Sequence, residues 1–159
     1  MIRLANETDL PHILEIYAVA KEFMHTHGNP NQWNGAYPDE ATLLADIQKG
    51  QLYVMDEDGI YGCFALIGGD DPTYAHIDGA WASDTPYGTI HRIAGSRTKK
   101  GVFAECVRFA RTRFDHLRVD THADNLPMQG AVTKEGFEHR GTIYLSDGAP
   151  RLAYEWVRT

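Results

Sequence analysis

The sequence has no apolar run near the roughly 20 residues that a membrane-spanning helix requires. Its opening segment, MIRLANETDL, lacks the basic-then-apolar order of a secretion signal. Cysteine is scarce, because only Cys63 and Cys106 are present, with neither a close partner nor the spacing of metal ligands. We therefore expect a cytoplasmic protein without a membrane partner or a disulfide framework, and with both thiols buried.

Basic residues are in short supply, since 15 Lys and Arg stand against 22 Asp and Glu, for a net charge of −7. Nucleic-acid phosphates need a basic footprint, so this balance argues against a nucleic-acid partner. It suits a cationic or neutral small molecule better. Repeats, low-complexity tracts and linkers are also absent. With 43% apolar residues the chain is long enough for a single core, and residues 1–159 are expected to form one domain.

Apolar runs bounded by turn and cap residues follow one another along the whole chain. They predict the order β-α-α-β-β-β-α-β-α-β-β, a mixed α/β sheet. The expected strands are residues 2–4, 52–55, 61–67, 88–93, 116–122, 137–145 and 151–157. The expected helices are one capped by Thr8, one from Pro38 to Gly50, one over about residues 100–114, and one from Asp124 or Asn125 to Gly136. Residues 68–87 are expected to form a long loop with at most an irregular strand.

The most informative stretch is residues 91–109, in which a strand breaks into a basic, glycine-bearing turn and a helix follows. The first N–H groups of a helix lack intrahelical acceptors, and the helix dipole places positive potential there. A phosphate over residues 98–103 would meet both, and Lys99 and Lys100 add formal charge. A strand, one glycine and two lysines also describe many ordinary loops, so the pattern alone fits either an anion-binding turn or such a loop.

Two local motifs, in this order of elements, resemble the GNAT superfamily of N-acetyltransferases over essentially the whole chain. The family's cofactor motif, Gln/Arg-x-x-Gly-x-Gly/Ala, corresponds to residues 98–103, which keep Gly101 but have Thr98 and Phe103 at the outer positions. The second motif is an Asn followed by a helix and a Gly-Phe pair. Asn125 and Gly136-Phe137 reproduce its spacing.

The resemblance implies a GNAT-like mixed central sheet flanked by helices, with a splay between the fourth and fifth strands, residues 88–93 and 116–122. It also implies that acetyl-CoA binds in that wedge as co-substrate. The Ile93 N–H would polarise the thioester carbonyl, and the diphosphate would lie over the turn. The implied cofactor-binding residues are Ile93, Thr98, Lys99, Lys100, Gly101, Val102, Phe103 and Asn125.

Phe103 stands where the family prefers a small residue, and its ring could block the diphosphate. Its spacing to Cys106, Val107, Ala110 and Phe114 is helical, however. If this stripe faces the sheet, the Phe103 ring points into the core and its backbone N–H stays free for a ligand. The direction of the Phe103 side chain therefore decides whether the turn can still bind the cofactor diphosphate.

The candidate catalytic residues are Tyr87, His91 and His122. His91 is the titratable group nearest Ile93, Tyr87 lies where some members of the family carry an acid or base, and His122 would form a polar wall of the acceptor site. Each also has a structural interpretation: His91 suits a hydrogen-bonded core histidine, Tyr87 an aromatic packed at a Pro-Tyr-Gly turn, and His122 a structural residue. The family's general-acid tyrosine would fall at Val132, and its absence is expected to slow the reaction rather than abolish it, because a thiol of pKa about 8.5 is a tolerable leaving group.

The resulting hypothesis is an acetyl-CoA-dependent N-acetyltransferase that acts on a small primary amine by direct attack in a ternary complex. The alternative is a non-catalytic acyl-CoA-binding or regulatory domain on the same fold. A third interpretation, a metal-dependent hydrolase, rests on the alternation of Asp120, His122 and Asp124, although Asp124 also suits a helix cap; no metal is expected. A homodimer is common in such folds, but no exposed stripe in the sequence demonstrates one.

Two loops carry candidate acceptor groups. Trp33 and Tyr37, in the loop between the first two helices, suit either an acceptor site or the edge of the core. The carboxylates of the long central loop would be solvated or would attract a cationic acceptor. These carboxylates are Asp70, Asp71, Asp78 and Asp84.

Overall fold

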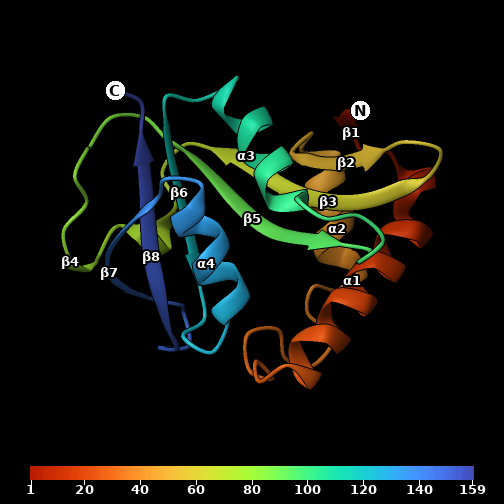
Figure 1. Ribbon diagram of the computed structural model, residues 1–159, viewed down its shortest axis with the longest axis horizontal. Helices are drawn as coiled ribbons and strands as arrows, with labels where there is room; N and C mark the ends of the chain where they lie inside the picture. Colours follow the sequence, from red (N-terminus) through yellow and green to blue (C-terminus); the bar gives the residue numbers. More distant parts are fainter.

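An eight-stranded mixed sheet runs through the protein, whose computed structural model describes residues 1–159 (Figure 1). The strands are β1 (Ile2–Leu4), β2 (Leu52–Asp56), β3 (Ile60–Gly68), β4 (Asp78–Gly79), β5 (Gly88–Gly95), β6 (His116–Thr121), β7 (Glu138–Tyr144) and β8 (Pro150–Val157). Their order across the sheet is β1-β2-β3-β5-β6-β8-β7-β4. Only β5 and β6 pair in parallel, and all other neighbours are antiparallel. The mixed sheet expected from the sequence is confirmed.

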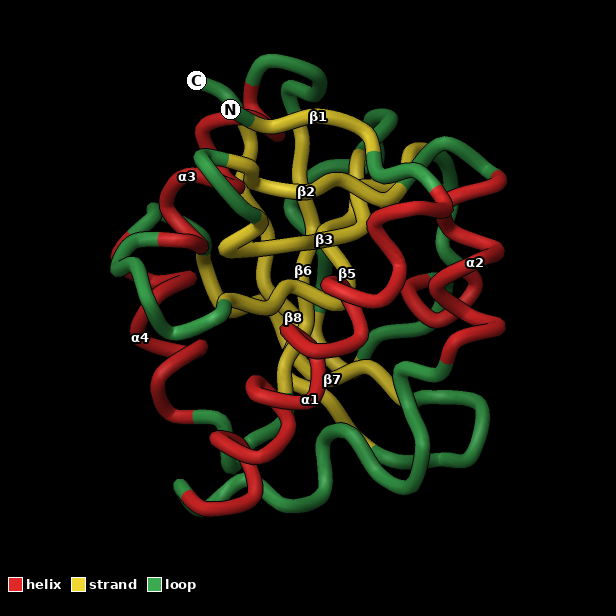
Figure 2. The backbone as a smooth tube through the Cα atoms, turned by 90° about the vertical axis from the view of Figure 1, so that its right-hand side faces the viewer, coloured by secondary structure: helices red, strands yellow, loops and turns green.

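Helices cover both faces of the sheet (Figure 2). The helices are α1 (Leu10–Thr26), α2 (Glu40–Gln48), α3 (Val102–Arg111) and α4 (Leu126–Lys134). α1 and α2 lie on one face and α3 and α4 on the other, with one apolar cluster beneath each pair. The predicted stripe of α3 faces the sheet, because Cys106, Val107 and Ala110 are fully buried. Both cysteines are free and buried, as expected. None of the helices combines the length and apolar character needed to cross a bilayer.

Two local predictions need correction, whereas the long central loop agrees with the expectation of a loop with an irregular strand. Thr8 does not cap the first helix; Asn6 accepts the Thr8 N–H and caps a single 3-10 turn, after which α1 begins at Leu10. The helix expected to reach residue 114 ends at Arg111. The loop of residues 68–87 contains a 3-10 turn at Pro72–Tyr74 and the short strand β4, which pairs with β7. Local sequence could not reveal this pairing, since the partner strand lies more than 60 residues away.

The splay between β5 and β6 is confirmed. The two strands pair only at Gly88 with Leu117 and at Thr89 with Arg118, and no later residue of β5 pairs with β6. On its other edge β5 carries a bulge, because Arg92 and Ile93 together lie opposite the single residue Phe64 of β3. The wedge therefore opens beside the bulge.

Candidate active site

The bulge of β5 is held by contacts from three other segments. Arg92 has a φ of 53°, a conformation that costs a non-glycine residue about 1–2 kcal/mol. The Tyr17 hydroxyl donates a 2.5 Å hydrogen bond to the Arg92 carbonyl oxygen. The Arg92 guanidinium donates to the buried Asp46 carboxylate at 2.8 and 2.9 Å, and to the Tyr37 hydroxyl at 3.2 Å. These contacts stabilise the strained residue and so fix the neighbouring His91 and Ile93.

A cavity of about 440 Å³ lies on one side of the wedge, between α1, β5, α3 and the start of α4. We call it the anion cavity. Arg97, Lys99 and Lys100 line it, and no carboxylate does. Gly101, with a φ of 78°, is the N-cap of α3, whose ten residues begin at the cavity. Cations and free helix N–H groups together suit a diphosphate.

Seven of the eight predicted cofactor-binding residues line the anion cavity. They are Ile93, Lys99, Lys100, Gly101, Val102, Phe103 and Asn125. Thr98 does not line it; its hydroxyl forms a 2.7 Å hydrogen bond with Ser96 Oγ. The Lys99 ammonium also forms a 2.6 Å ion pair with exposed Glu57. Sequence reasoning missed Arg97, which stacks 3.5 Å over the Phe23 ring; its charge beside the lysines was the available signal.

The Phe103 ring packs against the core on the α3 side of the sheet. Its centroid lies 6.2 Å from that of Phe137, and the side chain is partly buried. The stripe therefore points inward, as the spacing predicted. Phe103 also lines the anion cavity, so the residue contacts both the core and the cavity wall.

A second cavity, of about 400 Å³, adjoins the first and is called here the central cavity. The two cavities share lining residues from α1, β5 and the start of α4, namely Met24, Ile93, Asn125 and Met128. Trp33 and Tyr37 also line the central cavity, and Trp33 packs edge-on against Tyr17 with centroids 5.6 Å apart. The loop between α1 and α2 therefore serves both the core edge and the cavity wall.

A histidine–carboxylate pair lies in the wall of the central cavity. His91 Nε2 lies 2.8 Å from Asp71 Oδ2, and Thr73 donates its N–H and its hydroxyl to the other Asp71 oxygen. The hydrogen bond from His91, aided by those from Thr73, lowers the pKa of Asp71 to about 2. Because the carboxylate accepts a hydrogen bond from Nε2–H, the tautomer that leaves Nδ1 as an acceptor is favoured; Nδ1 makes no hydrogen bond within the protein.

The depressed pKa predicts how Asp71 contributes to stability. An unfolded Asp titrates near 3.9, so the stabilisation is complete above about pH 4 and is lost as the pH falls towards 2. We expect Asp71→Asn to lower the free energy of unfolding by about 1–2 kcal/mol at pH 7 and by much less at pH 2.5. Urea unfolding of both proteins at the two pH values measures this, and a difference that does not change with pH would contradict it.

A second acid lies deeper in the same cavity. The Tyr74 hydroxyl donates a 2.6 Å hydrogen bond to Asp120 Oδ2. Burial raises the pKa of Asp120, while the charges of His91 and Arg151 and the Tyr74 bond oppose the rise. Asp120 and Arg151 both line the cavity. Besides the His91–Asp71 pair, the cavity is thus lined by the acids Asp120 and Asp147 and by the guanidinium groups of Arg92 and Arg151.

Of the three predicted catalytic residues, only His91 lines the central cavity. Tyr87 is buried behind it, where its hydroxyl accepts the Asp71 N–H at 2.8 Å and its ring lies 4.0 Å from the Arg118 guanidinium. His122 lines neither cavity; its Nδ1 accepts the Asp124 N–H at 3.0 Å. The geometry gives Tyr87 and His122 structural contacts and leaves His91 as the catalytic candidate.

The other sequence candidates are placed as follows. Val132 is fully buried in the core. Asp120 bonds Tyr74 whereas His122 bonds Asp124, and no group of three or more His, Cys, Asp or Glu side chains is arranged to hold a metal ion. Asn125 caps α4 by accepting the Met128 N–H, so the cap is not Asp124.

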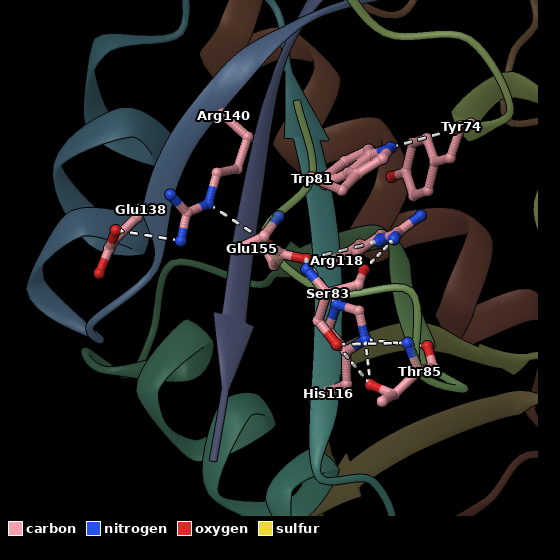
Figure 3. A network of polar contacts seen from close by, with 10 residues as sticks. Tyr74, Trp81, Ser83, Thr85, His116, Arg118, Glu138, Arg140 and Glu155 are labelled. Carbon is pink, nitrogen blue, oxygen red and sulfur yellow. Dashed lines mark hydrogen bonds and ion pairs between the residues drawn. The ribbon is translucent and has the colours of Figure 1, made fainter. Parts of the chain in front are cut away.

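A buried ionic network anchors the loop that carries Asp71 (Figure 3). Glu155 of β8 accepts the N–H groups of Ala82 and Ser83 at 2.8 and 3.3 Å. It also contacts His116 Nε2 at 2.7 Å and Arg140 Nε at 3.0 Å. The loop of residues 69–87 is therefore tied to the sheet by charge as well as by packing.

Comparison with known proteins agrees with this architecture. No family profile and no curated protein matches the sequence. Among solved structures, an acetyltransferase of the GNAT family from Streptococcus agalactiae 2603 is 29% identical, with a TM-score of 0.89 over 100% of this chain and 95% of that one. A Staphylococcus aureus Mu50 protein assigned as an acetyltransferase is 30% identical, with a TM-score of 0.72 over 99% of this chain and 98% of the other.

A more distant GNAT-family acetyltransferase, from Bacillus cereus ATCC 10987, is 18% identical with a TM-score of 0.64 over 100% and 97% of the two chains. At that identity the likeness shows the fold alone. The nearer likenesses define the class of protein as an acetyltransferase. The chain belongs to the GNAT superfamily, as its motifs predicted.

Proposed function

We propose that the protein transfers an acetyl group from acetyl-CoA to a small primary amine, by direct attack in a ternary complex. The observation that carries the proposal is the meeting of two cavities at Ile93, one cationic at a helix N-terminus and the other holding the His91–Asp71 pair. Acetyl-CoA, when bound, supplies the acyl group as an activated thioester. This arrangement favours an enzyme over the alternative, a non-catalytic acyl-CoA-binding domain on the same fold.

The residues of the anion cavity fit the CoA diphosphate. Arg97 and Lys100 have no carboxylate partner, so their charges are available to phosphate. The first N–H groups of α3, after Gly101, add uncompensated donors. The diphosphate would therefore lie at the end of the cavity away from His91, with the acyl end directed towards Ile93.

His91 would act as the general base that removes a proton from the amine. Alkylammonium groups have a pKa near that of Lys, about 10.4, so the attacking nitrogen must lose a proton. Nδ1 of His91 is the free acceptor, and Asp71 holds the ring and stabilises its charge once it accepts the proton. The reaction does not require a general acid at the position of Val132, because a thiol of pKa about 8.5, such as that of CoA, leaves as its thiolate without one.

Amine-dependent release of CoA tests the proposal. The purified protein is expected to bind acetyl-CoA and to release CoA when a panel of primary amines is added. Gly101→Val places a β-branched residue at a φ of 78°, a conformation that costs about 1–2 kcal/mol. The free turn is expected to relieve this strain by leaving the binding conformation, which should raise the Kd for acetyl-CoA about tenfold. Titration calorimetry measures the change.

A matched control is Gly148→Val, which has a φ of 86° in the turn between β7 and β8 and lines neither cavity. It should leave the Kd unchanged. Absence of acetyl-CoA affinity at millimolar concentration would exclude the proposal. Binding without amine-dependent CoA release would favour the non-catalytic domain.

A further inference from the structure

Arg151 is a buried arginine without a counter-ion. It is 6% exposed, lies at the start of β8 and lines the central cavity. No carboxylate lies within ion-pair distance of its guanidinium, whereas the other cavity arginine, Arg92, pairs with Asp46. A buried charge normally has a partner, because an isolated one is costly to desolvate. Arg151 therefore has capacity for an anion that the protein does not supply.

The guanidinium is only partly used by the protein. Arg151 donates to the carbonyl oxygens of Pro150 at 2.8 Å and Gln32 at 3.3 Å. A guanidinium has five N–H donors in a fixed fork that matches a carboxylate. The remaining donors belong to a side chain in the cavity wall, where a ligand can reach them.

Gln32 places a second set of donors in the same cavity. Its Oε1 accepts from Asn29 Nδ2 at 3.0 Å, Thr121 Oγ1 at 3.3 Å and Asn125 Nδ2 at 2.9 Å. These three bonds fix the amide orientation, so the oxygen faces the protein and the Nε2 group stays the donor. Nε2 makes no hydrogen bond within the protein, and Gln32 lines the cavity.

The remaining charges of the cavity complete the pattern. His91 is matched with Asp71, and Arg92 with Asp46. This leaves Arg151 and Asp120 as neighbouring groups of opposite sign, whose charges influence each other. Asp147, exposed at the rim, accepts the Ala149 N–H. A cavity with one free cation beside one acid is complementary to a small molecule that carries both charges close together.

We infer that the acceptor is an amino acid, or an amine that likewise bears a carboxylate near its nitrogen. This inference rests on the proposed function and names its substrate class. Arg151 and Gln32 Nε2 receive the carboxylate, while the amino group lies on the side of Asp120 and His91. A cavity of about 400 Å³ accommodates a molecule of this size.

Arg151 also braces the loop between α1 and α2 through the Gln32 carbonyl, so a loss of activity measured on one acceptor alone would not separate this structural contact from recognition of a carboxylate. The test therefore compares three acceptors with the same side chain: leucine, leucinamide, in which an amide replaces the carboxylate, and isopentylamine, which lacks it. The same comparison is made for amino acids with other side chains. The wild-type protein is expected to favour the amino acid over both analogues by about 10- to 100-fold in kcat/KM, because both lack the charge-assisted bonds. Arg151→Gln should reduce that ratio towards one.

Arg158→Gln is the matched control, because Arg158 also donates to a backbone carbonyl, that of Arg111, but lines neither cavity. It should leave the ratio unchanged. A wild-type ratio of one or less would overturn the inference, as would an Arg151→Gln variant that loses activity equally on all three acceptors. The wild-type comparison decides the question even if Arg151→Gln does not fold.

Failure of the inference can be told apart from failure of the proposed function. CoA release with isopentylamine but not with any amino acid would retain the function and overturn the inference. If no amine releases CoA, the proposed function fails. In that case, calorimetric titration of leucine and leucinamide into the CoA-saturated protein tests the carboxylate site by itself. Tighter binding of leucine supports the site, and equal binding of the two overturns it.

Discussion

His91→Ala is expected to lower kcat by about 10²- to 10³-fold while changing the Kd for acetyl-CoA little. The reason is that His91 is the one histidine in the wall of the central cavity, with Nε2 bound to Asp71 and Nδ1 free to accept a proton. The anion cavity is built from other residues and should be unaffected. Steady-state CoA release and calorimetry measure the two quantities separately.

His76→Ala serves as the control, because its side chain is 78% exposed and lines neither cavity. It should retain full activity. Added imidazole should restore part of the activity of His91→Ala, since a free base can occupy the space left by the ring; a residue that only supports the fold would show no such rescue. A kcat within threefold of wild type in a folded His91→Ala protein would contradict the assignment.

The sequence was most informative where the determinants of structure are local. Capping residues and helical spacing predicted α2, α3 and α4, and the stripe of α3 predicted the inward direction of the Phe103 ring. Seven residues of the anion cavity could be named from the sequence, because five of these seven lie in one run, residues 99–103. Their position follows from a strand that ends where a helix begins.

The central cavity could not be assembled in this way, because its groups come from distant segments. Asp71 looked like one of several solvated carboxylates until the loop placed it against His91, 20 residues away. Arg151 and Gln32 are 119 residues apart. No periodicity connects such pairs. The anchored loop of residues 69–87 brings Asp71 to His91, and the start of β8 places Arg151 against the loop between α1 and α2.

Glu155→Ala is expected to lower the free energy of unfolding by about 3–5 kcal/mol, and the melting temperature by about 10 °C or more. The Glu155 side chain is fully buried and is the acceptor shared by His116, Arg140 and the N–H groups of Ala82 and Ser83 (Figure 3). Its removal leaves these donors without a partner inside the protein. Thermal and urea unfolding measure the loss.

Glu138→Ala provides an internal control, because Glu138 contacts the same Arg140 side chain at 3.1 Å but is 70% exposed. An exposed pair contributes about 0–1 kcal/mol, so this variant should remain close to wild type. Since Glu155 holds the loop that carries Asp71, Glu155→Gln in a protein that still folds should weaken protection of the 82–83 amides against hydrogen exchange before it affects α3. Equal stability of the Glu155→Ala and Glu138→Ala proteins would show that packing alone, without the buried charge, fixes this loop against the sheet.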